Sequence, residues 1–270
     1  MRKVMTLIVC TTVALLGTTG VALGQLALPC CTDFNDNNLH GYGPCPAPHD
    51  NVSCTLVTPG PAGGGDIYLR AVDLPNSSSI CAGPDCLGDL TDVASSGCGA
   101  FCFDVRIFED ACVPGHPSCS LGYQPFAPYF AIDYKFGEPG ELRAIFRASF
   151  EITDSAGPNP GWHSICAPIA LLNNGQLPSN ADGFWEMTRG DSSNWDFLLA
   201  NFTKIWFPVD IIPNPGEIFG YDNFCLRDDV CPQGQIPTLT EWGMIIFCVL
   251  LFGWMTWVVV RRRRMVTVGI

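Results

Sequence analysis

Short runs of aromatic and β-branched residues, separated by glycine and proline, fill the middle of this chain and limit the folds open to it. Such runs are typical of β-strands, and glycine and proline mark the turns between them. With 28 glycines and 22 prolines in 270 residues, long helices have little room. We therefore predict an all-β fold, a β-sandwich. Its eight strands are expected at residues 52–57, 66–71, 100–108, 129–134, 142–152, 162–166, 205–211 and 219–226.

One segment departs from the strand pattern. Apolar residues recur from Trp195 to Phe202 at the spacing that places them on one face of a helix. Ser192 and Ser193 precede this segment and can cap a helix start. We therefore predict a single short helix packed on the sandwich. About 200 residues suffice for one core, so a single domain is expected between the two ends of the chain.

The first residues have the three parts of a secretory signal peptide. Arg2 and Lys3 precede an apolar stretch over residues 4–16, and small residues lead to a cleavage position just before Gln25. We expect residues 1–24 to be removed and the rest of the chain to be exported.

A second apolar segment lies near the other end. Residues 242–260 carry no charge, and at about 1.5 Å each they span roughly 28 Å, enough to cross a bilayer. The arginines that follow resist translocation, so residues 265–270 should form a cytoplasmic tail and residues 25–235 should lie outside. An ordinary single-pass anchor would also explain this helix. The arginines are Arg261, Arg262, Arg263 and Arg264.

The exported body is acidic and rich in cysteine. Without the two membrane-directed ends it holds eight basic and 25 acidic residues, a formal charge of −17. Such a surface repels nucleic acid and anionic lipid and suits divalent cations or neutral partners. Thirteen of the 15 cysteines lie in the body. Export makes disulfides the expected state, and an odd number leaves at least one thiol free or intermolecular.

Close cysteine spacings indicate local disulfide loops, although one sequence does not define the connectivity. Cys112, His116 and Cys119 could instead hold zinc, but two prolines and the oxidising compartment favour a disulfide. The pairs spaced for short loops are Cys81 with Cys86, Cys98 with Cys102 and Cys112 with Cys119.

The residues mark no catalytic group. No serine lies in a Gly-x-Ser-x-Gly elbow, the four histidines stand in unrelated settings, and no carboxylate pair stands out as acid and base. We expect a protein without enzymatic activity. The loop at residues 33–38 instead gathers Asp and Asn oxygens, which suit Ca²⁺, but it lacks the glycine and distant glutamate of an EF-hand.

Exposed aromatic rings are the usual platform for sugars, because a ring stacks on the apolar face of a pyranose. Trp185, Tyr123 and Tyr42 lie in loops rich in Gly or Pro and are the candidates, with ordinary packing as the alternative. Trp162, Trp195 and Trp206 lie in regular patterns and are expected in the core.

The C-terminal segment 236–264 combines a short motif, one apolar helix and an arginine cluster. The motif consists of Ile236, Pro237, Thr238, Leu239, Thr240, Glu241, Trp242 and Gly243. This arrangement resembles the IPTL-CTERM protein-sorting signal of Gram-negative and related bacteria. The resemblance implies an exosortase-like membrane protease as partner, which removes the helix and delivers the body to the cell surface or extracellular matrix.

Four stretches of the body occur in an order that resembles the laminin IV (laminin B) type domain, over residues 33–227. The resemblance implies a jelly-roll β-sandwich related to galactose-binding domains, without catalytic activity. The cysteine-rich regions 77–98 and 110–124 depart from the family. The four stretches are residues 63–73, 87–90 with 101–105, 161–164, and 198–205 with 220–226.

In related jelly rolls a structural calcium often lies where an early loop meets the last strand. The resemblance therefore implies that Asp33 and Asp36 meet Asp222 as Ca²⁺ ligands. In the alternative interpretation, Asp33 and Asp36 only form Asx turns and Asp222 caps a strand.

These features together predict an exported, non-catalytic surface protein that acts in adhesion or glycan binding. Its expected partners are the sorting protease, a polysaccharide or matrix glycan, and the membrane before processing, but no nucleic acid. One alternative is a structural coat component that self-associates through the odd cysteine without a ligand. The other is a surface hydrolase, which would need close carboxylates lining a pocket.

Overall fold

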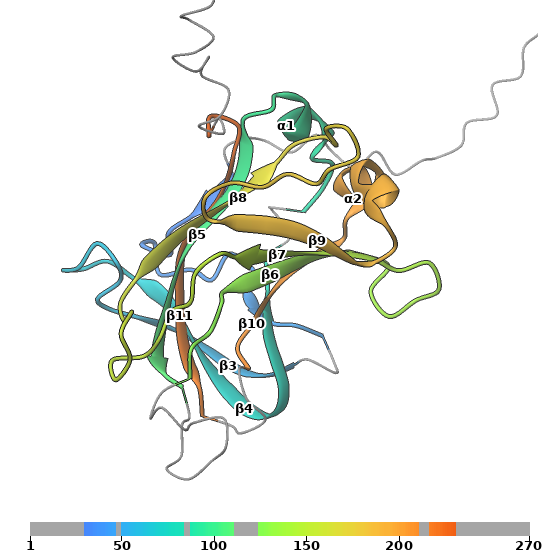
Figure 1. The fold of residues 1–270 in the computed structure, drawn as a ribbon. Helices are drawn as coiled ribbons and strands as arrows, with labels where there is room; N and C mark the ends of the chain where they lie inside the picture. Colours follow the sequence, from blue (N-terminus) through green and yellow to red (C-terminus); the bar gives the residue numbers. More distant parts are fainter. Residues whose placement is uncertain (1–29, 47–49, 84–86, 111–123, 211–215, 231–270) are drawn as a thin grey trace, which may run out of the picture.

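The computed structural model of the chain describes residues 30–46, 50–83, 87–110, 124–210 and 216–230. The predicted signal peptide and the predicted sorting tail with its membrane helix lie outside these ranges. None of the helices within them has the length and apolar character that a membrane crossing needs. Figure 1 shows strands layered into a sandwich, with α1 and α2 together at one end.

Two antiparallel sheets form the sandwich, which confirms the predicted all-β fold. Sheet A has the order β8, β5, β11, β4, β3, and β1 also pairs with β11; sheet B has the order β2, β4, β10, β6, β7, β9. The strands of sheet A are β1 (Cys30–Thr32), β3 (Asp50–Val57), β4 (Tyr68–Cys81), β5 (Gly99–Glu109), β8 (His163–Ile169) and β11 (Ile218–Arg227). Sheet B adds β2 (Gly43–Pro44), β6 (Tyr129–Tyr134), β7 (Leu142–Ala148), β9 (Gly183–Arg189) and β10 (Lys204–Pro208).

Strand β4 belongs to both sheets. Its first half pairs with β3 and β11 in sheet A, whereas its last three residues pair with β10 in sheet B. The change falls after Asp73: Val52 of β3 lies opposite Asp73, but Asp50 lies opposite Ser78. This irregularity bends β4 from one layer into the other.

Aromatic side chains fill the space between the sheets. Along β5, Phe101, Phe103 and Val105 are buried while the residues between them are less so, as expected for a strand with one face on the core. Phe103 packs edge-on against Phe207 of β10 and Phe130 of β6, with ring centroids 5.2 and 5.6 Å apart. Each such ring contributes roughly 2–3 kcal/mol by burial, so these contacts hold the two sheets together.

The predicted helix is present as α2 (Trp195–Asn201), and α1 (Thr91–Ser95) is a second short helix that was not predicted. Trp195 is fully buried, and its Nε1 donates a hydrogen bond to the Ala170 carbonyl at 2.8 Å. The capping residue is Asp191, whose carboxylate accepts from Ser193 N at 2.9 Å ahead of the 3-10 turn η3 (Ser192–Asn194). The serines expected to cap the helix therefore lie inside the first turn.

Strand β9 is the main element that the sequence did not predict. Its seven residues lie between Gly-rich turns, and its apolar residues are concentrated around Trp185, so the alternation was weak. In the structure Gly183 and Trp185 are buried, whereas Phe184 and Glu186 are exposed. This places Trp185 in a regular strand rather than in a loop.

Disulfides link strands that lie next to each other but far apart in sequence. They join Cys31 with Cys225, Cys45 with Cys81, and Cys102 with Cys166. The local pairings predicted for Cys81 with Cys86 and for Cys98 with Cys102 are therefore wrong, because antiparallel pairing brings distant cysteines directly opposite one another. The predicted pair Cys112 with Cys119 lies outside the described residues.

Cys54 on β3 is the free cysteine within the described ranges. Its side chain is partly buried, and burial raises the pKa of the thiol to about 12. The thiol therefore stays protonated at neutral pH and is a poor nucleophile.

Candidate functional site

The early loop and the last strand lie next to each other at one end of the β4–β11 ladder. Strand β1 pairs with β11, with Thr32 opposite Phe224, so the next residue, Asp33, is carried toward Asp222 of β11. Asp66 lies two residues ahead of β4 and comes to the same place. The converging carboxyl groups of Asp66 and Asp222, together with the nearby Asp33, are named the Asp222 site.

Asp222 is the buried centre of this site. Its side chain has no exposed surface, and its Oδ2 atom has no hydrogen-bond partner within the described residues. Burial is the main cause that raises its pKa to about 7; a hydrogen bond from Asn223 N opposes the shift, and the charges of Asp66, Asp104 and Asp33 add to it. A buried, unsatisfied carboxylate among other carboxylates is costly unless a proton or a cation neutralises it.

Backbone geometry aims Asp66 at Asp222. Ala62 N donates to Asp66 Oδ2 at 2.8 Å, and Asn35 Nδ2 donates to Asp66 Oδ1 at 3.1 Å. A side-chain carbon at position 60 would lie only 2.5 Å from Asp66 Oδ2 and 3.2 Å from Asp222 Oδ2. Gly60 therefore leaves the space on which two carboxylates converge.

These residues suit a hard divalent cation, because Ca²⁺ prefers carboxylate and amide oxygens. Asp66 and Asp222 converge and could contribute to such a site, but the oxygens of Asp33, Asp66 and Asp222 do not all lie within 4.8 Å of one another. Asp33 Oδ1 instead accepts from Asn35 N at 3.2 Å. Asp36 Oδ1 lies 3.0 Å from His40 Nε2 and also accepts from Asn38 N. The structure therefore does not support the prediction that Asp36 is a Ca²⁺ ligand. Calcium itself stays a prediction.

An open groove of about 540 Å³ lies next to the Asp222 site on the outer side of sheet A. Its polar groups bond to one another: Asn223 Nδ2 donates to Asp104 Oδ2 at 2.7 Å, and Ser164 Oγ donates to Asp104 Oδ1. The rings in its lining, Phe103 and Phe224, are buried in the core and present no face to a ligand. The groove therefore offers polar contacts but no stacking surface.

Two of the three predicted sugar-stacking residues are in the core, so those predictions are wrong. Trp185 is 4% exposed, and its Nε1 donates to the Pro168 carbonyl at 2.8 Å. Tyr42 is 3% exposed and stacks on Phe224 with ring centroids 4.4 Å apart. Tyr123 lies outside the described residues.

Alternation along sheet B presents a different set of aromatic residues. On β10, Ile205 and Phe207 belong to the core, so Lys204 and Trp206 point to the other side of the sheet. The same rule applied to the four strands defines the outer face of sheet B. It carries Lys204 and Trp206 from β10, Tyr129, Ala131 and Asp133 from β6, Arg143, Ile145 and Arg147 from β7, and Phe184 and Glu186 from β9.

Trp206 lies at the β10 end of this face and is held by charged neighbours. Its Nε1 donates to Asp133 Oδ2 at 2.7 Å, and its ring meets Tyr129 edge-on at 6.1 Å. Arg143 Nε donates to Asp133 Oδ1 at 2.6 Å, and the guanidinium lies 5.4 Å from the Trp206 ring centre. Burial raises the pKa of Asp133, and its contact with Arg143 offsets part of the shift.

The other end of the face is more exposed. The Arg147 guanidinium lies 5.5 Å from the Tyr129 ring centre, and its Nε lies 3.2 Å from Glu186 Oε2. Phe184, opposite Arg147 in the strand register, is 48% exposed. Aromatic faces and fixed hydrogen-bonding groups thus lie side by side, the combination that polar ring-shaped ligands need.

Basic residues concentrate around the outer face of sheet B. Five of the eight basic residues of the exported body lie on β7, β9 and β10 or directly after β6. The rest of this strongly acidic body therefore has few positive charges, and this face is its least repulsive surface for an anion. The five residues are Lys135, Arg143, Arg147, Arg189 and Lys204.

Sequence reasoning missed Asp66 and Tyr129 as site residues. The prediction that Trp206 lies in the core is wrong, because β10 turns its ring to the outer face of sheet B. A signal for Trp206 was present, since Ile205 and Phe207 flank it within a predicted strand and alternation then turns Trp206 away from the core. For Asp66 no local signal exists, because its role depends on Asp222, more than 150 residues away.

No protein-family model matches the chain, and no curated protein matches it. Among solved structures, it is similar to an exo-beta-agarase, with a TM-score of 0.44, 15% identity and coverage of 73% of this chain. It is also similar to CtCBM11, known from a solution structure, with a TM-score of 0.41 and 15% identity, covering 73% of this chain and 92% of that one. The chain spans only 24% of the agarase. At these values neither neighbour indicates a function.

Proposed function

We propose that this chain is an exported, non-catalytic surface protein that binds a polysaccharide through the outer face of sheet B. The observation that carries this proposal is the row of partly exposed rings, Tyr129, Trp206 and Phe184, interleaved with fixed charges. A pyranose has an apolar face that stacks on such rings and hydroxyl groups that bond to guanidinium and carboxylate groups. Sheet B offers both kinds of contact on one surface.

The charge of this face favours an acidic polysaccharide. Arg143 and Arg147 are paired with carboxylates, whereas no ion pair within the described residues includes Lys204 or Arg189. Arg189 is exposed at the end of β9 and remains available to uronate or sulfate groups, whereas the partly buried Lys204 holds its Nζ 3.7 Å from the Phe136 ring centre. Elsewhere the acidic body would repel such a polymer, which supports placing the binding surface on sheet B.

Calcium at the Asp222 site has a structural role in this proposal. The ion would replace the proton that Asp222 otherwise needs and would join the early loop to β11. The outer face of sheet B belongs to the other sheet, so calcium would act on binding through the stability of the sandwich rather than by touching the sugar.

The non-catalytic part of the proposal is supported by the burial of the tightest carboxylate group. Within the described residues, Asp73, Asp210 and Glu217 lie close enough to act together, but Asp73 and Glu217 are 3% and 0% exposed. A substrate would not reach them. Self-association through an odd cysteine is disfavoured for Cys54, because its thiol is partly buried and protonated.

Delivery to the surface by the C-terminal tail is part of the proposal and rests on the motif and the arginine cluster. Replacing Arg261 to Arg264 by glutamine should change the orientation of the tail or abolish its processing, measured by protease protection and by the mass of the surface-exposed form. Unchanged orientation and processing would remove the basis for sorting.

Affinity electrophoresis of the purified full chain tests the binding proposal. We expect retardation in gels containing a polyuronate and less in gels containing a neutral β-glucan. Phe184→Ala should weaken retardation by about three- to tenfold, because it removes one stacking ring. Phe197→Ala is a matched control, since Phe197 is 49% exposed but lies on α2.

Equal effects of the two substitutions would contradict the assignment of the face. If no polysaccharide retards the chain, the protein is a coat component without a glycan ligand.

A further inference from the structure

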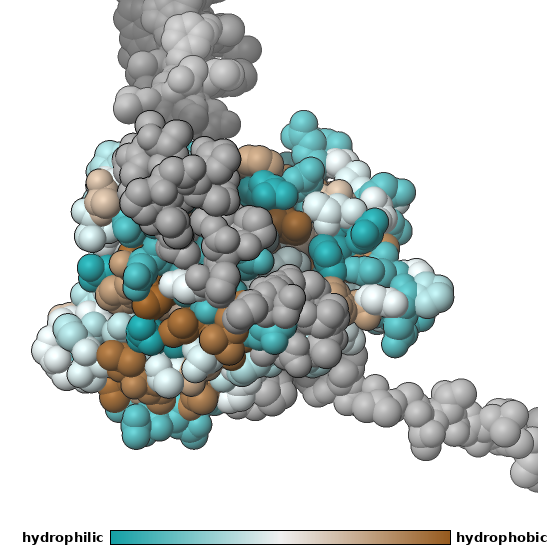
Figure 2. Space-filling model, turned by 90° about the horizontal axis from the view of Figure 1, so that it is seen from below, coloured by the Kyte–Doolittle hydropathy of each residue, from teal (hydrophilic) through white to brown (hydrophobic). Residues whose placement is uncertain are grey.

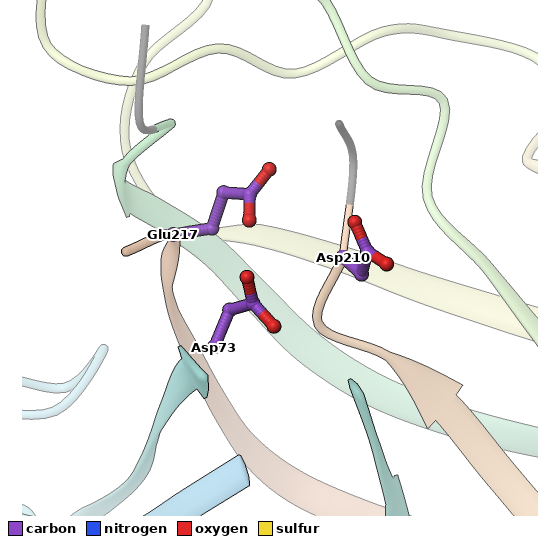
Figure 3. A group of neighbouring side chains, drawn as sticks. All are labelled: Asp73, Asp210 and Glu217. Atoms are coloured by element: carbon purple, nitrogen blue, oxygen red, sulfur yellow. The ribbon is translucent and has the colours of Figure 1, made fainter. Parts of the chain in front are cut away.

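Three carboxylates from three separate segments meet at the opposite end of the β4–β11 ladder from the Asp222 site. Asp73 lies on β4, Asp210 follows β10, and Glu217 immediately precedes β11. Their oxygen atoms all lie within 4.8 Å of one another. Figure 3 shows the Asp73 carboxylate pointing toward the other two. The Asp73 backbone N also donates to the Glu217 carbonyl at 2.9 Å, which holds these two segments of the chain side by side.

This group is buried and strongly like-charged. Asp73 is 3% exposed, Glu217 is fully buried and Asp210 is partly buried. Burial raises the pKa of Asp73, and burial together with the charge of Asp73 raises the pKa of Asp210 to about 6. At neutral pH the group must therefore hold a proton or a cation.

Asp73 supplies an independent sign of a missing ligand. Its Oδ1 is buried and has no hydrogen-bond partner within the described part of the chain. No ion pair in that part includes Asp73 or Asp210. A buried acceptor aimed into a group of carboxylates, with no basic side chain to neutralise it, is the arrangement of an oxygen-ligand cation site.

We propose that Asp73, Asp210 and Glu217 bind a calcium ion, at a second cation site that is separate from the Asp222 site. Ca²⁺ suits these residues because it takes six to eight hard oxygen ligands, including bidentate carboxylates. Mg²⁺ demands a stricter octahedral geometry and keeps several waters, which a buried group accommodates less well.

The position of this site gives the ion a structural task. Asp73 lies where β4 leaves sheet A, Asp210 follows a strand of sheet B, and Glu217 leads into a strand of sheet A. One ion would therefore link both layers at the bend of β4.

Figure 2 views the molecule from below, toward the end at which β4 and β3 lie in Figure 1, and shows hydrophobic residues gathered in one region among hydrophilic ones.

Equilibrium dialysis with radioactive calcium tests this proposal on the purified full chain, because it counts bound ions. We expect two high-affinity ions per chain for the wild type, one for Asp222→Asn, one for Glu217→Gln, and none for the double variant. Glu186→Gln, which removes an exposed carboxylate, is the control and should retain two.

Far-UV circular dichroism shows whether each variant is folded. If Glu217→Gln does not fold, the same dialysis is carried out with Asp210→Asn, since Asp210 is less buried. This variant should bind one of the two calcium ions about tenfold or more weakly, because affinity follows ligand charge. The proposal is overturned if the wild type binds a single ion that Asp222→Asn abolishes, because protons then neutralise the second group. Glycan binding need not change in Asp222→Asn, Glu217→Gln or Asp210→Asn, so either outcome is independent of the function proposed above.

Discussion

Replacing Asp222 by asparagine should have opposite effects on stability with and without calcium. Without calcium, Asp222 has a pKa of about 7 when folded, against about 4 in an unfolded chain. A raised pKa favours the folded state only while the group is protonated. The stabilisation is therefore complete below about pH 4 and is lost as the pH rises through 7.

The size of the effect follows from that shift. Three pKa units correspond to about 4 kcal/mol, so ionised Asp222 should lower the free energy of unfolding of the wild type by at most this amount at pH 8. Asparagine at this position carries no charge and avoids this loss. In a chelator at pH 8, Asp222→Asn should therefore unfold at higher urea concentration than the wild type, by up to a few kcal/mol. With calcium at a hundredfold excess over its dissociation constant for the Asp222 site, the wild type should gain about 3 kcal/mol more from calcium than the variant.

Urea unfolding of the oxidised chain in mild detergent, at pH 4 and pH 8 with chelator or calcium, measures all of these values. Asp36→Asn is the matched control, because Asp36 lies in the same loop but pairs with His40 at the surface; it should change stability by less than about 1 kcal/mol. The reasoning is refuted if Asp222→Asn is less stable than the wild type in chelator at pH 8. It is also refuted if calcium stabilises both proteins equally.

Three further predictions concern the scaffold. Replacing Cys31 and Cys225 by alanine should lower the free energy of unfolding by up to about 5 kcal/mol, because this disulfide closes a loop across 194 residues; calorimetry would show a large drop in Tm, and an unchanged Tm would contradict it. Cys54 should react with iodoacetamide at pH 8 only after unfolding, as mass spectrometry would show, since burial keeps its thiol protonated. Trp185→Ala should cost about 3–5 kcal/mol in urea unfolding, as expected for a core ring, and a change below 1 kcal/mol would place Trp185 at the surface after all.

The strands were predictable where apolar residues alternate over several positions. The segments 129–134 and 219–226 match β6 and β11 closely, because both alternate and are bounded by turn residues. β9 was missed because its pattern is short, and the second half of β4 was missed because Pro75 and three serines conceal a strand that changes sheets.

The site was only partly predictable, for a physical reason. Asp33 and Asp222 were paired through a resemblance to a family; the charge of Asp33 does act on Asp222, but Asp33 Oδ1 accepts from Asn35 N in an Asx turn, as the alternative interpretation held. Asp66 required the tertiary fold, since its carboxylate reaches Asp222 only through the turn at Gly60. The sugar platform was misplaced because loops were expected to carry exposed rings, whereas Trp185 and Tyr42 lie in the core and the partly exposed rings lie on strands.

Glycan binding on sheet B is the central claim, and a nuclear magnetic resonance titration tests it most directly. An oligosaccharide of the polymer that retards the chain would be added to the isotope-labelled protein while the amide and indole N–H resonances are followed. We predict that the Trp206 indole signal and the amides of Tyr129, Arg147 and Phe184 shift together and saturate at one concentration. Shifts confined to Ser164 and Asn223 in the groove of sheet A, or no shift at saturating sugar, would contradict the claim.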